Sequence, residues 1–148
     1  DFSTKAGVPN GFQLVGNAAN EIAPGKRMLS SMTPTFIESP RGLMIAGSPG
    51  GSYITGMVLL ATLDFLDGRS AAEIVAAPRI HHQYLPDVLQ YERDALTPNE
   101  IESLTKRGYT LRESKRGWGN LQVVTWDYAS GRVDAASDPR GEGEGQVY

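Results

Sequence analysis

The stretch Gly47-Ser48-Pro49-Gly50-Gly51-Ser52 lies between two strongly apolar segments. Residues 42–46 are typical of a short buried strand, and residues 53–66 are apolar on nearly every face, which predicts a buried helix. A glycine turn between strand and helix leaves backbone N–H groups unpaired at the helix start, where the helix dipole adds partial positive charge. Two adjacent glycines let an oxygen atom approach these groups closely. The turn therefore suits a carboxylate, a phosphate or an oxyanion.

The same stretch also fits a tight turn that simply needs glycine, and the pattern leaves both interpretations open. Two other glycine motifs are excluded. A phosphate-binding P-loop requires a lysine that this turn lacks. A nucleophile elbow requires the spacing G-x-S-x-G, whereas Ser48 directly follows Gly47.

Composition limits the possible functions. The chain has 148 residues, 40% of them hydrophobic, which is enough for the core of one domain or a large part of one. Its net charge is −3, and no run of lysine and arginine exceeds two neighbours, so we expect neither nucleic acid nor membrane as a partner. Cysteine is absent, which excludes disulfides, thiolate metal sites and a cysteine nucleophile.

The first 27 residues contain regularly spaced glycine and proline and are predicted to form a loop. A loop of this length is more often a lid or a binding loop than filler, although a frayed terminus remains the alternative. Asp1 is not preceded by a methionine or a signal sequence, and we therefore expect residues 1–148 to be a single-domain fragment of a longer chain.

The remaining chain predicts an α+β architecture of antiparallel hairpins with helices on one side. We expect strands over residues 33–38, 42–47, 88–91, 109–112, 121–127 and 132–136, and helices over 51–67, 70–78 and 97–108. Capping boxes begin the second and third helices. The glycine-rich tail, residues 138–145, is expected to be flexible.

Polar side chains outside the glycine turn have structural and functional interpretations. Ser30 and Ser31 precede the first strand, where their hydroxyls can bind a ligand or close a turn. The pair His81-His82 suggests a metal site, but adjacent residues on an extended chain point to opposite faces and would not share one ion. We therefore expect structural hydrogen bonds from these histidines, and no metal.

Several motifs in order resemble the small subunit of γ-glutamyltranspeptidase, an N-terminal nucleophile hydrolase. They are residues 1–3 with 7–10, 24–35 and 47–52, supported by 77–86 and 136–140. The resemblance covers essentially the whole chain. Met28 stands where the family usually has proline. The resemblance implies an αββα sandwich, built from two pieces separated by autoproteolysis, and a bacterial enzyme found in the periplasm or outside the cell.

The resemblance also implies roles for individual residues in γ-glutamyl transfer or hydrolysis on compounds such as glutathione. The residue matching Asp1 binds the substrate's α-amino group, and those matching Ser30 and Ser31 bind its α-carboxylate. Those matching Gly50 and Gly51 supply the N–H groups of the oxyanion hole. The loop near residues 6–17 resembles a lid. Its Phe12 replaces a common tyrosine, so a hydrogen bond through that hydroxyl would be missing.

The resemblance places two essential groups outside this chain. The family nucleophile is a threonine upstream of Asp1, and the arginine that pairs with the substrate carboxylate belongs to the large subunit. We therefore expect the large subunit of the same precursor as a partner, no cofactor, and no activity from the isolated fragment. Two alternatives remain: a related acylase of the same superfamily, and a non-catalytic module that binds amino acids.

Overall fold

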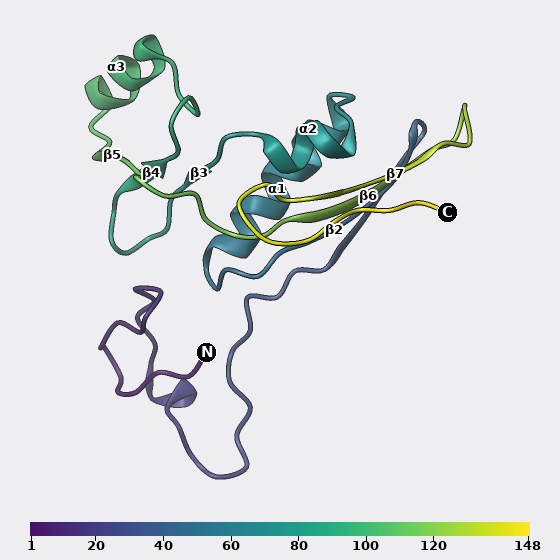
Figure 1. The fold of residues 1–148 in the computed structure, drawn as a ribbon. Helices are drawn as coiled ribbons and strands as arrows, with labels where there is room; N and C mark the ends of the chain where they lie inside the picture. Colours follow the sequence, from purple (N-terminus) through teal and green to yellow (C-terminus); the bar gives the residue numbers. More distant parts are fainter.

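The computed structural model describes residues 1–148, which form two small sheets, three α-helices and a long N-terminal segment (Figure 1). The larger sheet is antiparallel, with its strands in the spatial order β1 (Thr35–Ser39), β2 (Gly42–Gly47), β6 (Gln122–Asp127) and β7 (Val133–Ser137). The smaller sheet has the order β3 (Ile80–His81), β4 (Leu89–Tyr91) and β5 (Leu111–Glu113). The helices are α1 (Tyr53–Leu66), α2 (Ala71–Ala76) and α3 (Pro98–Lys106), with one 3-10 turn at Ala18–Asn20. Mixed helices and antiparallel hairpins confirm the α+β prediction.

The predicted hairpin is present, with β1 and β2 joined by a tight turn and Ser39 paired with Gly42. Strand β1 begins at Thr35, two residues later than expected. Pro34, which lacks a backbone N–H, precedes it and cannot donate to a strand ladder. Strand β2 then leads directly into the glycine turn and α1, as the sequence predicts.

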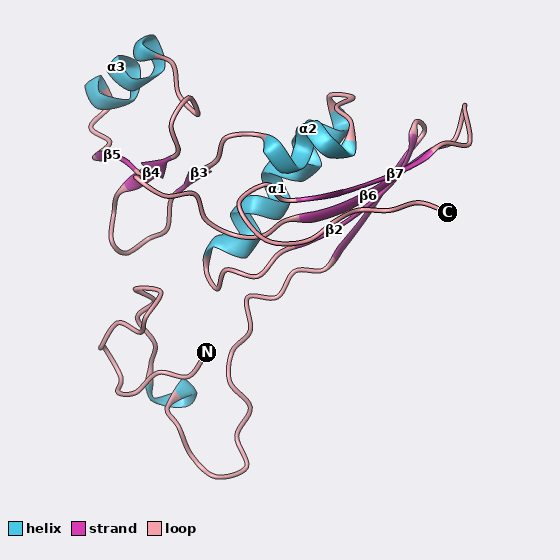
Figure 2. Cartoon of the chain, in the orientation of Figure 1, coloured by secondary structure: helices cyan, strands magenta, loops and turns pink.

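The larger sheet has two different faces. Met44, Ala46 and Val123 point to one face, where they are buried under α1 and α2 (Figure 2). On the other face, one cross-strand row consists of Phe36, Ile45 and Val124, all exposed. Alternate residues of a strand point to opposite sides, so the sheet is covered on one side and open on the other.

Helix α1 is less buried than its composition predicts. Its inner face, which includes Met57 and Phe65, packs in the core. Leu59, Leu63 and Leu66 remain at least half exposed, at 58%, 50% and 56%. The expectation of a fully buried helix is therefore wrong for this chain on its own, because nothing within residues 1–148 covers the outer face.

The shorter helices begin as predicted. Ser70 and Glu73 form a capping box at α2, and Thr97 and Glu100 form another at α3, where Pro98 occupies the first helical position. Strand β5 runs parallel to β4, so α3 is the crossover between them. Strand β3 was not predicted, since two residues are too short to show a periodic pattern.

Residues 1–34 lie beside the layered part of the domain and contain the 3-10 turn and two isolated β-bridges, but no α-helix or longer strand (Figure 2). This agrees with the predicted loop over residues 1–27. None of the helices has the length and apolar character needed to span a bilayer.

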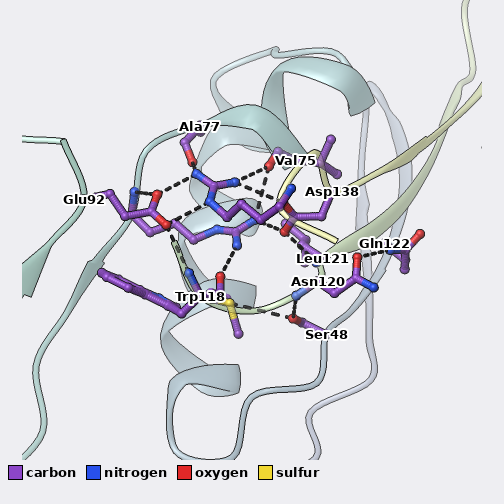
Figure 3. A network of polar contacts seen from close by, with 12 residues as sticks. Ser48, Val75, Ala77, Glu92, Trp118, Asn120, Leu121, Gln122 and Asp138 are labelled. Atoms are coloured by element: carbon purple, nitrogen blue, oxygen red, sulfur yellow. Dashed lines mark hydrogen bonds and ion pairs between the residues drawn. The ribbon is translucent and has the colours of Figure 1, made fainter. Parts of the chain in front are cut away.

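The C-terminal tail is not the flexible end that the sequence suggests. Asp138 is 2% exposed and forms an ion pair of 2.5 Å with Arg79, itself 3% exposed (Figure 3). Arg140 contacts Asp138 at 3.1 Å and Glu92 at 2.5 Å. Farther along, a Cβ on Gly145 would lie 2.5 Å from the backbone of Ala135, so the tail runs closely beside β7.

This network of two guanidinium groups and two carboxylates stabilises the C-terminal tail. Burial alone would raise the pKa of the Asp138 carboxyl. Backbone N–H groups of Leu121 and Arg140, together with Arg79, outweigh burial and hold that pKa below its usual value. Arg140 also donates to the carbonyls of Val75 and Ala77 at the end of α2 (Figure 3). Local composition cannot predict an anchor whose partners lie on distant elements.

Candidate functional site

The N-terminal segment brings Asp1 beside the serine pair. The amide of Asn20 donates to the Asp1 carbonyl at 2.9 Å and to the Ser3 hydroxyl at 3.2 Å. Its oxygen accepts the Leu29 N–H at 3.1 Å. Asn20 therefore joins Asp1 to the residue that precedes Ser30, a connection that sequence reasoning missed.

The side chains of this pair differ in their partners. Asp1 is exposed, and its carboxylate forms no hydrogen bond or ion pair within residues 1–148. The Ser30 hydroxyl accepts the Met32 N–H at 3.1 Å, as expected of a turn. The hydroxyl proton of Ser30 has no acceptor within the chain. Ser31 is partly buried, and its hydroxyl has no partner. The Asp1 carboxylate and the hydroxyls of Ser30 and Ser31, which lie on adjacent backbone segments, are therefore available to a ligand.

The glycine turn requires glycine for its geometry. Gly50 and Gly51 have φ angles of +139° and +57°, in the region that side chains disfavour. Their carbonyls accept the N–H groups of Tyr53 and Ile54, which start α1. The N–H groups of Gly50, Gly51 and Ser52 have no acceptor within the chain. Both interpretations from the sequence therefore stand together, because a tight turn of this kind also exposes N–H donors.

Residues 118–120 connect the glycine turn to the buried ion network. Arg79 donates to the carbonyl of Trp118 at 2.5 Å. Two residues later, the N–H of Asn120 donates to the Ser48 hydroxyl at 3.2 Å (Figure 3). Gly119 lies between these contacts, with a φ of +84°, and a Cβ there would lie 2.2 Å from the sulfur of Met57. Close packing at Gly119 thus fixes the turn against α1.

Phe12 lies over the glycine turn. A Cβ added to Gly51 would lie 2.5 Å from two carbon atoms of the Phe12 ring. The Phe12 carbonyl accepts a hydrogen bond of 3.0 Å from the Gln83 amide. The loop over residues 6–17 therefore reaches the glycine turn, and its role as a lid stays a prediction.

Two separate cavities have some of the candidate residues in their linings. One, of about 510 Å³, is lined by Ser31 and by Ser52 of the glycine turn, together with Leu59 and His81. Another, of about 380 Å³, is lined by Asp1 and Phe12. Residues of the loop over 6–17 line both cavities, with Leu14 in the first and Phe12 in the second, whereas Ser30, Gly50 and Gly51 line neither.

The two histidines have separate surroundings, in agreement with the prediction of structural hydrogen bonds. His81 is buried, stacks on Tyr53 with ring centroids 3.8 Å apart, and contacts the Gln83 oxygen at 2.9 Å. Burial lowers the pKa of His81, which favours the neutral ring. His82 is exposed and contacts Asp87 at 2.8 Å.

The family model of γ-glutamyltranspeptidase matches residues 1–148, the whole chain.

The chain belongs to the γ-glutamyltranspeptidase family.

Named relatives agree with this assignment. The chain is 40% identical to the glutathione hydrolase proenzyme of Pseudomonas aeruginosa, over 99% of this chain and 27% of the relative. It is 41% identical to the glutathione hydrolase proenzyme of Escherichia coli, over 95% of this chain and 24% of the relative. The chain therefore spans only a minor part of the curated relatives that it matches.

Solved structures of the γ-glutamyltranspeptidase family share the fold. An acivicin-inhibited γ-glutamyltranspeptidase superposes with a TM-score of 0.86 at 37% identity, covering 96% of this chain and 77% of that one. The enzyme of Pseudomonas nitroreducens gives 0.85 at 39% identity, covering 99% and 77%. The expected fold, part of an αββα sandwich of the N-terminal nucleophile hydrolase type, is thereby confirmed.

Proposed function

We propose that this chain is part of an enzyme that transfers a γ-glutamyl group from glutathione or a related compound to water or to an amino acceptor. The observation that carries the proposal is the turn at Gly50 and Gly51. Its N–H groups have no acceptor in the chain, and the ring of Phe12 covers it, in a member of the γ-glutamyltranspeptidase family. Donors in such a position suit an anion that forms during acyl transfer.

The recognition groups suit the head group of an α-amino acid. The exposed Asp1 carboxylate would pair with the substrate ammonium group, as a charge-assisted hydrogen bond. The hydroxyls of Ser30 and Ser31 would donate to the substrate carboxylate. Asn20 supports both contacts, because it bonds to the backbone of Asp1 and of Leu29. A bare acyl chain would leave these polar groups without partners.

The reaction then follows from the positions of these groups. A hydroxyl nucleophile, by the resemblance a threonine outside residues 1–148, attacks the γ-carbonyl carbon and places negative charge on its oxygen. The N–H groups of Gly50 and Gly51 would stabilise that oxygen, and losing one such donor typically lowers kcat by about 10²–10³-fold. The amine then leaves, and water or an acceptor amine releases the γ-glutamyl group from the nucleophile.

The partner that we propose is the large subunit of the same precursor. The open face of the larger sheet has the exposed row Phe36, Ile45 and Val124, which continues to Ala135 on β7. In an αββα sandwich, this face packs against a second sheet. The curated relatives are named proenzymes and are longer than this chain, which supports an occupant from the same precursor.

The test compares anilides of γ-glutamate, of α-glutamate and of a simple acyl group, using the complete processed protein. We expect turnover of the γ-glutamyl anilide only, and none from a preparation of residues 1–148 alone. Preference for the simple acyl anilide would replace the proposal with the related acylase. Binding of glutamate without turnover would replace it with the non-catalytic module. Turnover by a verified preparation of residues 1–148 would refute the mechanism.

A further inference from the structure

The side-chain amide of Gln83 contacts four groups, two in its own segment and one each in the N-terminal loop and at the start of α1. Its nitrogen donates to the carbonyl of Phe12 at 3.0 Å and to the carbonyl of Leu85 at 2.7 Å. Its oxygen accepts from the hydroxyl of Ser52 at 2.8 Å and contacts Nε2 of His81 at 2.9 Å. Gln83 therefore connects the N-terminal loop, the start of α1 and the end of β3.

The chemistry of these partners determines how the amide is oriented. Carbonyl oxygens only accept, so the two N–H groups of Gln83 must face Phe12 and Leu85. The oxygen then faces Ser52 and His81, and the neutral His81 ring carries its proton on Nε2. Both N–H groups and both lone pairs of the amide are used. A side chain in which every hydrogen-bonding position is filled has one preferred orientation.

The loop depends on this amide for its position. Within residues 8–15, the other hydrogen bonds are local, for example those from the N–H groups of Phe12 and Leu14 to the Asn10 side chain. The bond from Gln83 to Phe12 is the one hydrogen bond that joins this loop tip to the layered part of the domain. Beside it, a cavity of about 360 Å³ separates residues 13–15 from residues 83–85. Without Gln83, no hydrogen bond joins residues 8–15 to the layered part of the domain, although the Phe12 ring still lies against Gly51.

We propose that Gln83 is a positioning residue that holds the loop over residues 6–17 closed on the glycine turn. The same amide also fixes Ser52, which directly follows the proposed oxyanion-hole glycines. Closure of the loop and the geometry of the turn are therefore coupled through one side chain. This inference rests on the proposed function for its catalytic consequence, but not for the contact itself.

The test uses Gln83→Glu in the complete processed protein. The carboxylate keeps the shape and the acceptor toward Ser52, but it replaces the amide nitrogen, which carries both donors, with one oxygen that faces the carbonyls of Phe12 and Leu85. We expect hydrogen exchange of the amides in residues 10–14 to rise about tenfold, because a hydrogen bond is exchanged for repulsion. We also expect KM for a γ-glutamyl anilide to rise more than kcat falls. Gln83→Met, which removes the bonds without repulsion, should show a smaller effect in the same direction.

Gln90→Glu is the matched control. Gln90 lies opposite His81 in the same small sheet and donates to the Tyr53 hydroxyl at 3.0 Å, away from the loop. This variant should leave exchange in residues 10–14 unchanged. Unchanged hydrogen exchange in Gln83→Glu would overturn the proposal that Gln83 holds the loop closed. Faster exchange with an unchanged KM would show that closure of the loop does not contribute to substrate binding. Faster exchange in a protein that turns over no γ-glutamyl compound would support the role of Gln83 in holding the loop and would refute the proposed function.

Discussion

Replacing Gly51 with alanine tests how the glycine turn and the Phe12 ring depend on each other. The first cost is conformational, since Gly51 has a φ of +57°, and a left-handed conformation costs an alanine about 1–2 kcal/mol. The second cost is steric, because the new Cβ would lie 2.5 Å from the Phe12 ring. Overpacking costs about 1–3 kcal/mol. We expect the lower end, because one hydrogen bond at the tip holds the loop and the ring can move.

A double-mutant cycle separates these two costs. In Gly51→Ala combined with Phe12→Ala, the overlap disappears and only the conformational cost remains. The two substitutions should therefore be coupled by about 1 kcal/mol, within the range seen for residues in contact. Gly131→Ala is the matched control, because Gly131 has a φ of +71° and open space where its Cβ would lie. Its cost should be conformational alone and should not change with Phe12→Ala.

The assay is urea unfolding of the complete protein, with kcat measured on the folded fraction. Effects of Gly51→Ala and Phe12→Ala that simply add would refute the contact between ring and turn. The kinetics test the separate catalytic role of Gly51. Compared with Phe12→Ala alone, the double variant should have a kcat lower by about 10²–10³-fold with little change in substrate affinity, because the ring is absent from both proteins. A lower free energy of unfolding with kcat preserved would make the turn purely structural. The oxyanion role of both glycines would then be withdrawn.

Three further predictions concern other parts of the chain. Asp1→Ala should raise KM strongly, since removing the counter-charge of a bound ammonium costs about 2–5 kcal/mol, and Asp1→Glu should restore part of it; a nearly normal KM in the alanine variant would show that Asp1 does not bind the amine. The pKa of Asp138 is held below 3.8 in the folded chain, so its carboxylate stabilises the fold above pH 3.8, and that stability is lost as the pH falls further. Asp138→Asn should therefore destabilise the protein at pH 7 by about 3–5 kcal/mol, because the Arg79 guanidinium loses its charged partner. The variant should also lose less of its free energy of unfolding as the pH falls below 3.8. The same dependence of stability on acid pH in both proteins would contradict this. Val124→Asp places a charge on the open sheet face and should prevent association of the two subunits, as measured by size-exclusion chromatography. Ser103→Asp, on the exposed surface of α3, is the control and should leave association unchanged.

Patterns within short segments were enough to predict most of the elements. The short apolar run over residues 42–46 predicted the second strand of the hairpin of β1 and β2, and the capping boxes predicted where α2 and α3 begin. These signals are local, because an element's periodicity and its first hydrogen bonds involve residues close in the sequence. Strand β3 was missed because two residues show no period, and α1 was taken as fully buried because composition does not show which faces find a partner.

The sequence by itself determined the glycine turn between β2 and α1 and, through the motifs around it, the family of the chain. The tertiary structure decided which side chains reach that turn. Gln83 bonds to Phe12 across 71 positions, and Arg79 pairs with Asp138 across 59. Neither pair leaves a pattern in the sequence, because residues so far apart become neighbours only when the sheets and loops pack. The buried charges of the tail and the closed position of the loop therefore depend on the folded chain.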